Sequence, residues 1–476
     1  MRISLWIARR EIAERMRDGR VILSAAAVLV MLLSSFALGW QRYYSRNKQA
    51  TDIQNSERAR WLAQRDRSPH TAAHQGIYVF RQQSLLSTLD SGVDGFFGIA
   101  THAEDEQHFF EWKPAEDETI AHRFGQVSVG GMLQYILPLL LILLTYPVFV
   151  AERENGIARL TLSLGVHRRD YVLGKLLGAL LPMGVLHPVA VLILAALRLL
   201  SGGPAFRNAL PAVLLLAGSY VLYAMVFVGV ALGISALAHS SRAALLSLLL
   251  FWSLLSFVFP HLAIEVVERA IRTPTAAEIL EARQAAAVAS PNRDDQIREI
   301  QKELLATYRV SEVKQLPLSP VGVFMLRSLE AGEPASAAVF DRAYGAYLRQ
   351  EHMLGSFGLL DPTISIQDLS MALAQTDSEA MVDAAHSAEQ YRFNLVRIMN
   401  RDIALHRDPT LPINTLADDY HRGIEVWSQV PPYVYLGPSI GQIMRHHTRS
   451  LLFLCLWAVG AAGFATLAIR RMKVDA

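Results

Sequence analysis

Few residues of this 476-residue chain have the types and spacing of a catalytic site. A GK pair at Gly174 and Lys175 suggests a phosphate-binding loop, but the motif G-x-x-x-x-G-K-[ST] needs glycine where Arg169 stands and serine or threonine where Leu176 stands. The metalloprotease motif HExxH and the hydrolase motif GxSxG do not occur in the chain. We therefore expect no catalytic residue, no cofactor held by this chain, and ATP hydrolysis only on another subunit.

Histidines are the remaining candidates for metal ligands. His70 and His74 stand one helical turn apart, and His102, His108 and His122 follow in the same polar region. No acidic residue or cysteine stands at a spacing diagnostic of a metal site. We expect these side chains to be solvated surface histidines, and we assign no metal ligand.

The composition indicates an integral membrane protein. Hydrophobic residues make up 52% of the chain and the mean hydropathy is +0.25, so the 18% of charged residues must gather outside the lipid. A net charge of +2 argues against nucleic acid as a partner, since binding phosphates requires a basic surface. The single cysteine, Cys455, excludes a disulfide within one chain.

The apolar residues gather in six segments, each long enough for the ~30 Å core of a bilayer. These segments are residues 21–40, 129–150, 171–200, 210–238, 243–264 and 451–469. The first also resembles a signal peptide, but its apolar run is long and lacks a small-x-small cleavage site. Residues 1–20 contain six arginines, which predicts an interfacial helix on the cytoplasmic membrane surface or, alternatively, a simple basic leader.

Basic residues set the predicted orientation. They crowd residues 1–20, residues 151–170 and the tail 470–476, which the positive-inside rule places in the cytoplasm. Two long polar segments, residues 41–127 and 265–447, then lie on the other side, which is the periplasm in a Gram-negative organism. The prediction is a mainly α, polytopic membrane protein with six spans, cytoplasmic termini and two extracytoplasmic insertions that form a mostly helical outer domain.

The second polar segment shows helical patterns separated by proline and glycine turns. The predicted helices are Ala276–Ala289, Asp294–Tyr308, Ser336–Met353 and Ser378–Leu405. The last of these presents an apolar face with Tyr391, Phe393, Val396 and Ile398. Because the first polar segment is poor in apolar runs, we expect it to pack against this face rather than fold alone.

Two pairs of glycines stand one helical turn apart in the predicted spans. They are Gly174 with Gly178, and Gly229 with Gly233. Bare backbone at such positions allows helices to approach closely, although glycine is also simply frequent in membrane helices.

Three polar side chains fall within the predicted spans. His187 stands near the middle of the third span, where an ionisable group is costly unless it faces water or a partner. Tyr220 and Tyr223 in the fourth span are candidates to line the same space. These residues mark a possible translocation path, and the alternative is that they hydrogen-bond and pack inside the bundle.

The charged residues 151–170, which we call the elbow, lie between two long apolar segments. Gly156 breaks a turn after Glu152 and Glu154, leucines follow, and Arg168 leads into a helix that starts near Tyr171. Such a segment can dock on a partner, and the alternative is an ordinary positive-inside loop.

The order ERENG, a leucine-rich turn, then LGVHRRDYVLGK resembles the coupling-helix region of ABC-2 type exporter permeases. This chain has Gly165 where many ABC-2 relatives have proline. The resemblance implies that the residues of this region couple the permease to an ATPase. They are Glu152, Arg153, Glu154, Gly156, Leu160, Leu164, Arg168 and Lys175.

The resemblance extends to the polar segments and covers nearly the whole chain. LSPVGVF, LLDPTISIQDLSMALAQTD and HSAEQYRFNLVRIMNRD are similar to the extracytoplasmic insert of the ABC-2 subgroup known as DUF3526. SLLSTLDSGVDGFFG resembles a segment of the same subgroup.

The resemblance implies the permease subunit of an ATP-driven exporter in the bacterial inner membrane. Its partners would be a separate ABC ATPase, which binds ATP and Mg, and either a second copy of this chain or a similar permease. One alternative is an ABC-linked mechanotransmitter or binding protein whose outer domain engages a periplasmic or cell-surface partner without transport. Another is a membrane enzyme, which lacks a nucleophile or metal constellation here.

Overall fold

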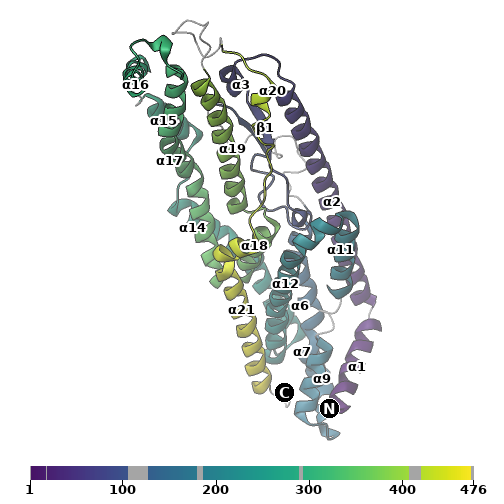
Figure 1. Cartoon of the computed structure of the whole chain (residues 1–476). Helices are drawn as coiled ribbons and strands as arrows, with labels where there is room; N and C mark the ends of the chain where they lie inside the picture. The colour runs from purple at the N-terminus through teal and green to yellow at the C-terminus, as the bar shows by residue number, and fades with distance from the viewer. Residues whose placement is uncertain are drawn as a thin grey trace.

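The computed structural model shows a long, mainly α-helical molecule and describes residues 2–17, 19–105, 127–179, 186–288, 293–406 and 420–472. Both ends of the chain lie at one end of the molecule, beside α1 (Arg2–Arg17) and α9 (Arg168–Ala179) (Figure 1). At the opposite end lie α3 (Pro69–Gln75) and α16 (Arg293–Tyr308) (Figure 1). The helical content and the long apolar helices confirm the predicted mainly α polytopic membrane protein.

Within the described part of the chain, five helical stretches are long and apolar enough to cross a membrane. They are Ile22–Leu62, Val129–Glu154, Pro204–Leu237, Ser241–Ala270 and Ile440–Arg471. The predicted third span, residues 171–200, contains α9 and the apolar helix α11 (Leu186–Leu200), and its residues 180–185 lie outside the described ranges. The count of six spans stays a prediction.

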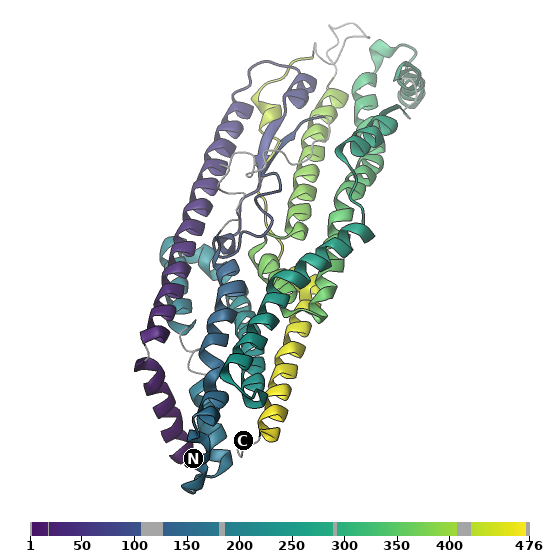
Figure 2. The same ribbon diagram turned by 180° about the vertical axis from the view of Figure 1, so that it is seen from behind.

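The second helix runs far beyond the predicted first span. α2 (Gly19–Leu62) has 44 residues, so it is about 66 Å long, roughly twice the thickness of a bilayer core. The chain has no glycine or proline between Gln41 and Leu62 to end the helix. α2 therefore continues along the side of the molecule into the domain opposite the elbow (Figure 2), which we call the outer domain after its predicted side.

The first polar segment contains a small sheet that the helical patterns do not predict. β1 (Ile77–Phe80) pairs antiparallel with β2 (Ala100–Ala103), with Ile77 opposite Ala103. The run IYVF in β1 combines β-branched and aromatic residues, which is the composition typical of a strand. The short helix η1 (Leu85–Thr88) follows β1.

Prolines divide the middle spans into shorter helices. The second span consists of α5 (Val129–Gly131), the π-helix η3 (Met132–Ile136), α6 (Leu137–Thr145) and α7 (Pro147–Glu154). The long α12 (Gly203–Leu237) is followed by α13 (Ser241–Ser253), the π-helix η4 (Leu254–Val258) and α14 (Phe259–Ala270). Pro138, Pro147 and Pro260 each follow residues that are already helical, so each removes one backbone donor from a continuous helical stretch.

The second polar segment is helical almost throughout its described part. Its helices are α15 (Ala276–Val288), α16, η5 (Val313–Gln315), α17 (Pro320–Ser356), η6 (Phe357–Leu359), α18 (Pro362–Ala374), α19 (Ser378–Leu405) and α20 (Ile424–Trp427). α19 has the predicted bounds, whereas α17 starts well before Ser336 because Ser319 caps it and Pro320 begins it. The last helix, α21 (Ile440–Arg471), forms the final span.

The two polar segments share one core. Trp61 of α2 lies edge-on to Trp427 of α20 with ring centres 5.9 Å apart. The Trp61 indole donates to the Trp427 carbonyl at 3.0 Å, and the Trp427 indole donates to the Gln64 carbonyl at 3.1 Å. Tyr391 and Val396 of α19 belong to the same buried cluster, which forms the predicted mostly helical outer domain.

The predicted orientation is testable with single cysteines in a Cys455→Ala background. Gln390 is exposed on α19 and Asn155 is exposed in the elbow between α7 and α9, and these helices lie in opposite halves of the molecule (Figure 1). We expect Gln390→Cys to react with an impermeant thiol reagent in cells whose outer membrane alone is permeabilised. Asn155→Cys should react only after the inner membrane is lysed, and the reverse labelling pattern would contradict the orientation.

Candidate functional site

The elbow is a short helix set between two left-handed glycines. α7 ends at Glu154, α8 (Ile157–Ser163) follows, and α9 begins at Arg168. Gly156 has φ of 71° and Gly165 has φ of 87°, a conformation that strains any residue with a Cβ. The chain reverses sharply at these glycines, so that α8 is presented as a separate unit.

The outward face of α8 carries two exposed leucines. Leu160 is 61% exposed and Leu164 is 76% exposed, whereas Ala158 on the opposite side is buried against the bundle. Adjacent exposed apolar side chains are typical of an interaction surface. We call Leu160 and Leu164 the leucine pair.

Glu152, the first charged residue of the elbow, binds α9. Its carboxylate accepts a hydrogen bond from the Tyr171 hydroxyl at 2.7 Å and lies 2.7 Å from the Lys175 ammonium. Lys175 also binds Glu11 of α1, so one lysine neutralises two acids. These four residues form a buried ionic cluster that joins α1, α7 and α9.

Lys175 does not extend to the surface, as a snorkelling lysine would. Lys175 is only 3% exposed to solvent, because Glu11 of α1 lies against it. The sequence reasoning missed Glu11 as a partner, since it stands 164 residues away. The only feature of the sequence that points to Glu11 is its position on the polar side of the predicted N-terminal helix.

The next two residues of the elbow bind two further helices at their ends. Arg153 donates to the carbonyl of Ala236 at 2.8 Å and to that of Ala238, where α12 ends. Glu154 accepts a hydrogen bond from the backbone N–H of Ser241 at 3.0 Å, where α13 begins. A cation at a helix C-terminus and an anion at an N-terminus both match the helix dipole.

Arg168 at the far side of the elbow binds the end of α21. Its guanidinium donates to the carbonyls of Ile469 at 2.9 Å, Arg470 at 3.1 Å and Met472 at 2.8 Å. The last carbonyls of a helix have no partner within the helix, so this contact satisfies groups that would otherwise need water. Arg153 at the end of α7 and Arg168 at the start of α9 thus hold the ends of α12 and α21 to the two helices that flank α8.

The glycine pair in α9 lies against α1. A Cβ added to Gly174 would lie 2.6 Å from Ile7 Cβ, and one added to Gly178 would lie 2.6 Å from Glu11 Cγ. Side chains at these positions would push α1 away and open the ionic cluster.

The glycine pair in α12 lies against α21. A Cβ on Gly229 would lie 3.0 Å from Ala461 Cβ, and one on Gly233 would lie 2.3 Å from a ring carbon of Phe464. The two long helices whose ends the elbow arginines bind are therefore also in close contact along their length.

A comparison with protein families finds that residues 5–474 match the model described as "ABC-2 family transporter protein". The chain belongs to the ABC-2 family of transporter proteins. It is accordingly a membrane permease component of an ABC transporter. A search of curated proteins finds no relative of the chain.

The tyrosines of this ABC-2 protein lie where α12 meets the outer domain. The Tyr220 hydroxyl lies 3.1 Å from the Gln134 amide and 3.1 Å from the Ser370 hydroxyl of α18. Tyr223 donates to the Gln134 carbonyl at 2.8 Å and contacts Thr363 of α18 at 3.3 Å. Both tyrosines are buried and hold α12 to α18.

Asp90 completes this junction from the first polar segment. Its carboxylate accepts hydrogen bonds from Ser370 at 2.5 Å and from the Gly92 backbone at 3.0 Å. Burial raises the pKa of the Asp90 carboxyl, because the charged form loses solvation. The outer ends of the spans therefore bind the outer domain through polar groups rather than through apolar packing alone.

An apolar cavity of about 390 Å³ opens beside this junction. Its described lining includes Tyr220, Ser370 and residues of α11 and α12, and it does not include Tyr223. The predicted path residue His187 lies on α11, but its side chain is outside the described residues. Of the three predicted path residues, the structure thus places Tyr220 on a cavity wall.

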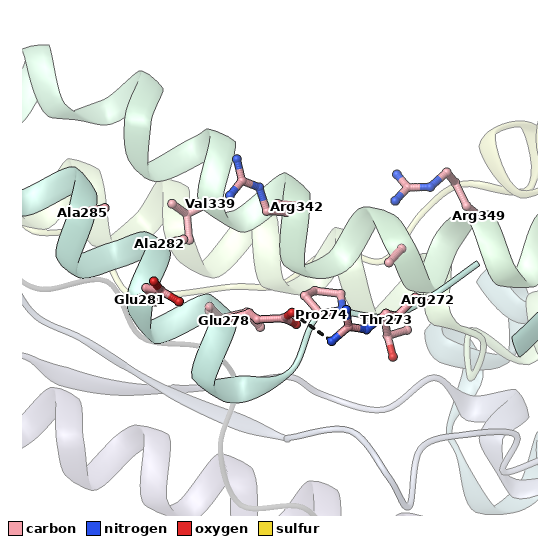
Figure 3. A pocket seen from close by; sticks show the side chains of 12 residues that line it. Arg272, Thr273, Pro274, Glu278, Glu281, Ala282, Ala285, Val339, Arg342 and Arg349 are labelled. Atoms are coloured by element: carbon pink, nitrogen blue, oxygen red, sulfur yellow. Dashed lines mark hydrogen bonds and ion pairs between the residues drawn. The ribbon is translucent and has the colours of Figure 1, made fainter. Parts of the chain in front are cut away.

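A second cleft, of about 500 Å³, lies between α15 and α17 (Figure 3). Arg272 at its edge binds Glu278 at 2.9 Å, and Arg342 and Arg349 stand apart from each other along α17 (Figure 3). These guanidinium groups do not converge on one point, so we assign the cleft no ligand.

The histidines of the first polar segment form no cluster among the described residues that offers three converging ligands. His70 and His74 lie with their Nε2 atoms 3.3 Å apart, and Nδ1 of His74 lies 2.8 Å from Asp105. His108 and His122 lie outside the described residues.

The ionic cluster predicts a stability effect at Lys175. Lys175→Met removes the only cation among the cluster's four residues and leaves Glu11 and Glu152 close together, which should cost roughly 3 kcal/mol and lower Tm in a thermal-shift assay. Adding Glu11→Gln should recover part of the loss. Arg269→Gln, which breaks the exposed pair with Glu265, is the control and should leave Tm nearly unchanged. Equal Tm values for Lys175→Met and Arg269→Gln would contradict the cluster.

Proposed function

We propose that this ABC-2 protein is the permease of an ATP-driven exporter and that α8 docks on a separate ATPase subunit. The observation that carries the proposal is the leucine pair on a short helix whose flanking residues bind the ends of three other helices, α12, α13 and α21. Docking a partner on α8 would therefore act on several spans at once. The chain lacks a phosphate-binding loop, which supports a separate subunit that binds ATP and Mg.

The proposed mechanism follows from the two arginines. A displacement of α8 pulls on Arg153 and Arg168, and so on the ends of both α12 and α21. Because these two helices are in close contact at Gly229 and Gly233, they move together rather than separately. ATP binding on the partner would favour one of two arrangements of this helix pair.

The transporter is proposed to work as a dimer in the bacterial inner membrane, with its termini and elbow in the cytoplasm. The second permease would be another copy of this chain or a similar one.

The ionic cluster gives the side chains of the elbow an indirect role. Glu152 and Lys175 are turned inward, so they set the position of α8 and leave direct contact to the leucine pair.

A second candidate function is mechanotransmission to a periplasmic partner. It is supported by the contacts that carry α12 into the outer domain, Tyr220 to Ser370 and Tyr223 to Thr363, and by the unbroken length of α2. In this case the same elbow movement would change the outer domain without moving a substrate. Stimulation of ATP turnover by a small compound favours export, and stimulation by a periplasmic protein favours mechanotransmission.

Docking is tested by substituting the leucine pair. Leu160→Ser with Leu164→Ser should weaken co-purification of the ATPase, because exposed apolar surface is lost from the proposed contact. The variant should keep its Tm, since neither side chain is buried. The control is Leu436→Ser, which alters a leucine that is 82% exposed in the outer domain. Wild-type recovery of the ATPase with the double variant would rule out docking through α8.

Coupling is tested separately at Arg168. Arg168→Gln should retain the ATPase but reduce the movement of α21 that ATP induces, because the link to its last carbonyls is lost. The movement can be measured as the distance between spin labels on α21 and α8. Arg159→Gln, on the exposed side of α8, is the matched control. If both variants show the wild-type distance change, the arginine link does not transmit the movement.

A further inference from the structure

A buried histidine joins the last span to the outer domain. α18 lies between the lower end of α19 and the upper end of α21 (Figure 1), and His447 of α21 is only 1% exposed at this junction. Its Nδ1 lies 2.9 Å from Oδ2 of Asp368 on α18, and the Ser450 hydroxyl donates to the same oxygen at 2.5 Å. Because a carboxylate only accepts hydrogen bonds, Nδ1 carries the proton.

The other ring nitrogen of His447 faces two further carboxylates. Nε2 lies 3.3 Å from Oδ2 of Asp377 and 3.4 Å from Oε2 of Glu379, and it is buried without a hydrogen bond of acceptable geometry. In the neutral ring this nitrogen is an acceptor, so three acceptors would meet at one buried point. Such an arrangement requires either a proton on Nε2 or a metal ion between the three atoms.

We propose that Asp377, Glu379 and His447 bind a divalent metal ion of the zinc type. Tetrahedral zinc binds nitrogen and oxygen at about 2.0–2.2 Å, which places neighbouring ligand atoms about 3.3–3.5 Å apart. The two measured distances from Nε2 have these values, and the three ligand atoms lie within 4.8 Å of one another. The proposal does not depend on docking of an ATPase.

The surrounding hydrogen bonds match those of a metal-binding histidine. Metal-bound imidazoles commonly donate their second N–H to a carboxylate, which fixes the ring, and Asp368 has this position relative to His447. Asp377 caps α19 with its other oxygen, Oδ1, which accepts from the Ala380 N–H at 3.0 Å. Its Oδ2 thereby stays directed at the proposed ion.

A more exposed group of ligands adjoins this site. Glu379 presents its second oxygen, Oε1, to Nε2 of His352 at 2.5 Å and to Nδ1 of His446 at 3.4 Å. The two imidazole rings lie 5.9 Å apart and nearly parallel, and both are partly exposed to solvent. Glu379 is shared by both groups, one carboxylate oxygen facing each.

The competing interpretation is a protonated His447 paired with the same carboxylates. It predicts no metal binding, so stoichiometry distinguishes the two. We would purify the full chain without a histidine tag in lipid nanodiscs, remove metals with a chelator and titrate Zn²⁺. The proposal predicts one tightly bound ion per chain and, with Co²⁺ as the probe, visible absorption bands typical of a tetrahedral site. Absence of a stoichiometric ion in the wild-type protein overturns the proposal.

Near-isosteric variants locate the ion. Asp377→Asn retains the helix cap and Glu379→Gln retains the side-chain volume, and each should weaken Zn²⁺ binding at least about tenfold. Asp368→Asn should weaken it by a similar factor through the orientation of His447. Glu389→Gln, on the same helix but paired with Arg392, is the control and should bind as wild type.

The exposed histidines provide the decisive comparison. His352→Ala with His446→Ala should retain one ion with the Co²⁺ spectrum of the wild type. Loss of the ion in this double variant, with retention in Asp377→Asn, would place the ion outside the buried site and overturn the assignment. His386→Ala, an exposed histidine elsewhere on α19, is the matched control.

Discussion

The binding of two helix ends by two arginines is the contact on which the arrangement of the spans depends. The last carbonyls of a helix have no partner inside the helix, so they must bind water or another donor. Arg153 and Arg168 supply such donors for α12 and α21, from the two helices that flank α8. The contacts that satisfy these helix ends also hold the elbow, and with it α8, beside α12 and α21.

The same pair of helices carries the connection to the other end of the molecule. In its middle, α12 contacts α21 through Gly229 and Gly233, where close approach leaves little freedom for either helix to shift alone. Farther from the elbow both helices bind α18, α12 through Tyr220 near its middle and α21 through His447 near its start. α18 therefore contacts both α12 and α21. Any motion of one of these helices relative to the other would have to break polar contacts with α18.

The sequence predicted the elements better than their contacts. Hydropathy indicated apolar segments that overlap the five helical stretches long enough to cross a membrane, and helical periodicity gave α19 its bounds, because both signals are local. The buried partners of the elbow could not be read in this way. Glu11 stands 164 residues from Lys175, and the acceptors of Arg168 are backbone carbonyls, which leave no trace in a sequence. For the same reason the group Asp377, Glu379 and His447 was missed, since its ligands come from the start of α19 and from α21, which are far apart in the sequence.

The distribution of charge along the α12–α21 pair indicates where the molecule can change state. Close contacts between glycine, alanine and phenylalanine change steeply with distance, so the middle of the pair favours a single packing. Ionic and hydrogen-bonding groups lie at its two ends, the arginine contacts at the elbow and the Asp368–His447 contact at α18, and such groups can exchange partners. We infer that the pair moves as one body. Rearrangement is then confined to its ends, where the proposed docked subunit or bound ion would act directly on the groups that must exchange.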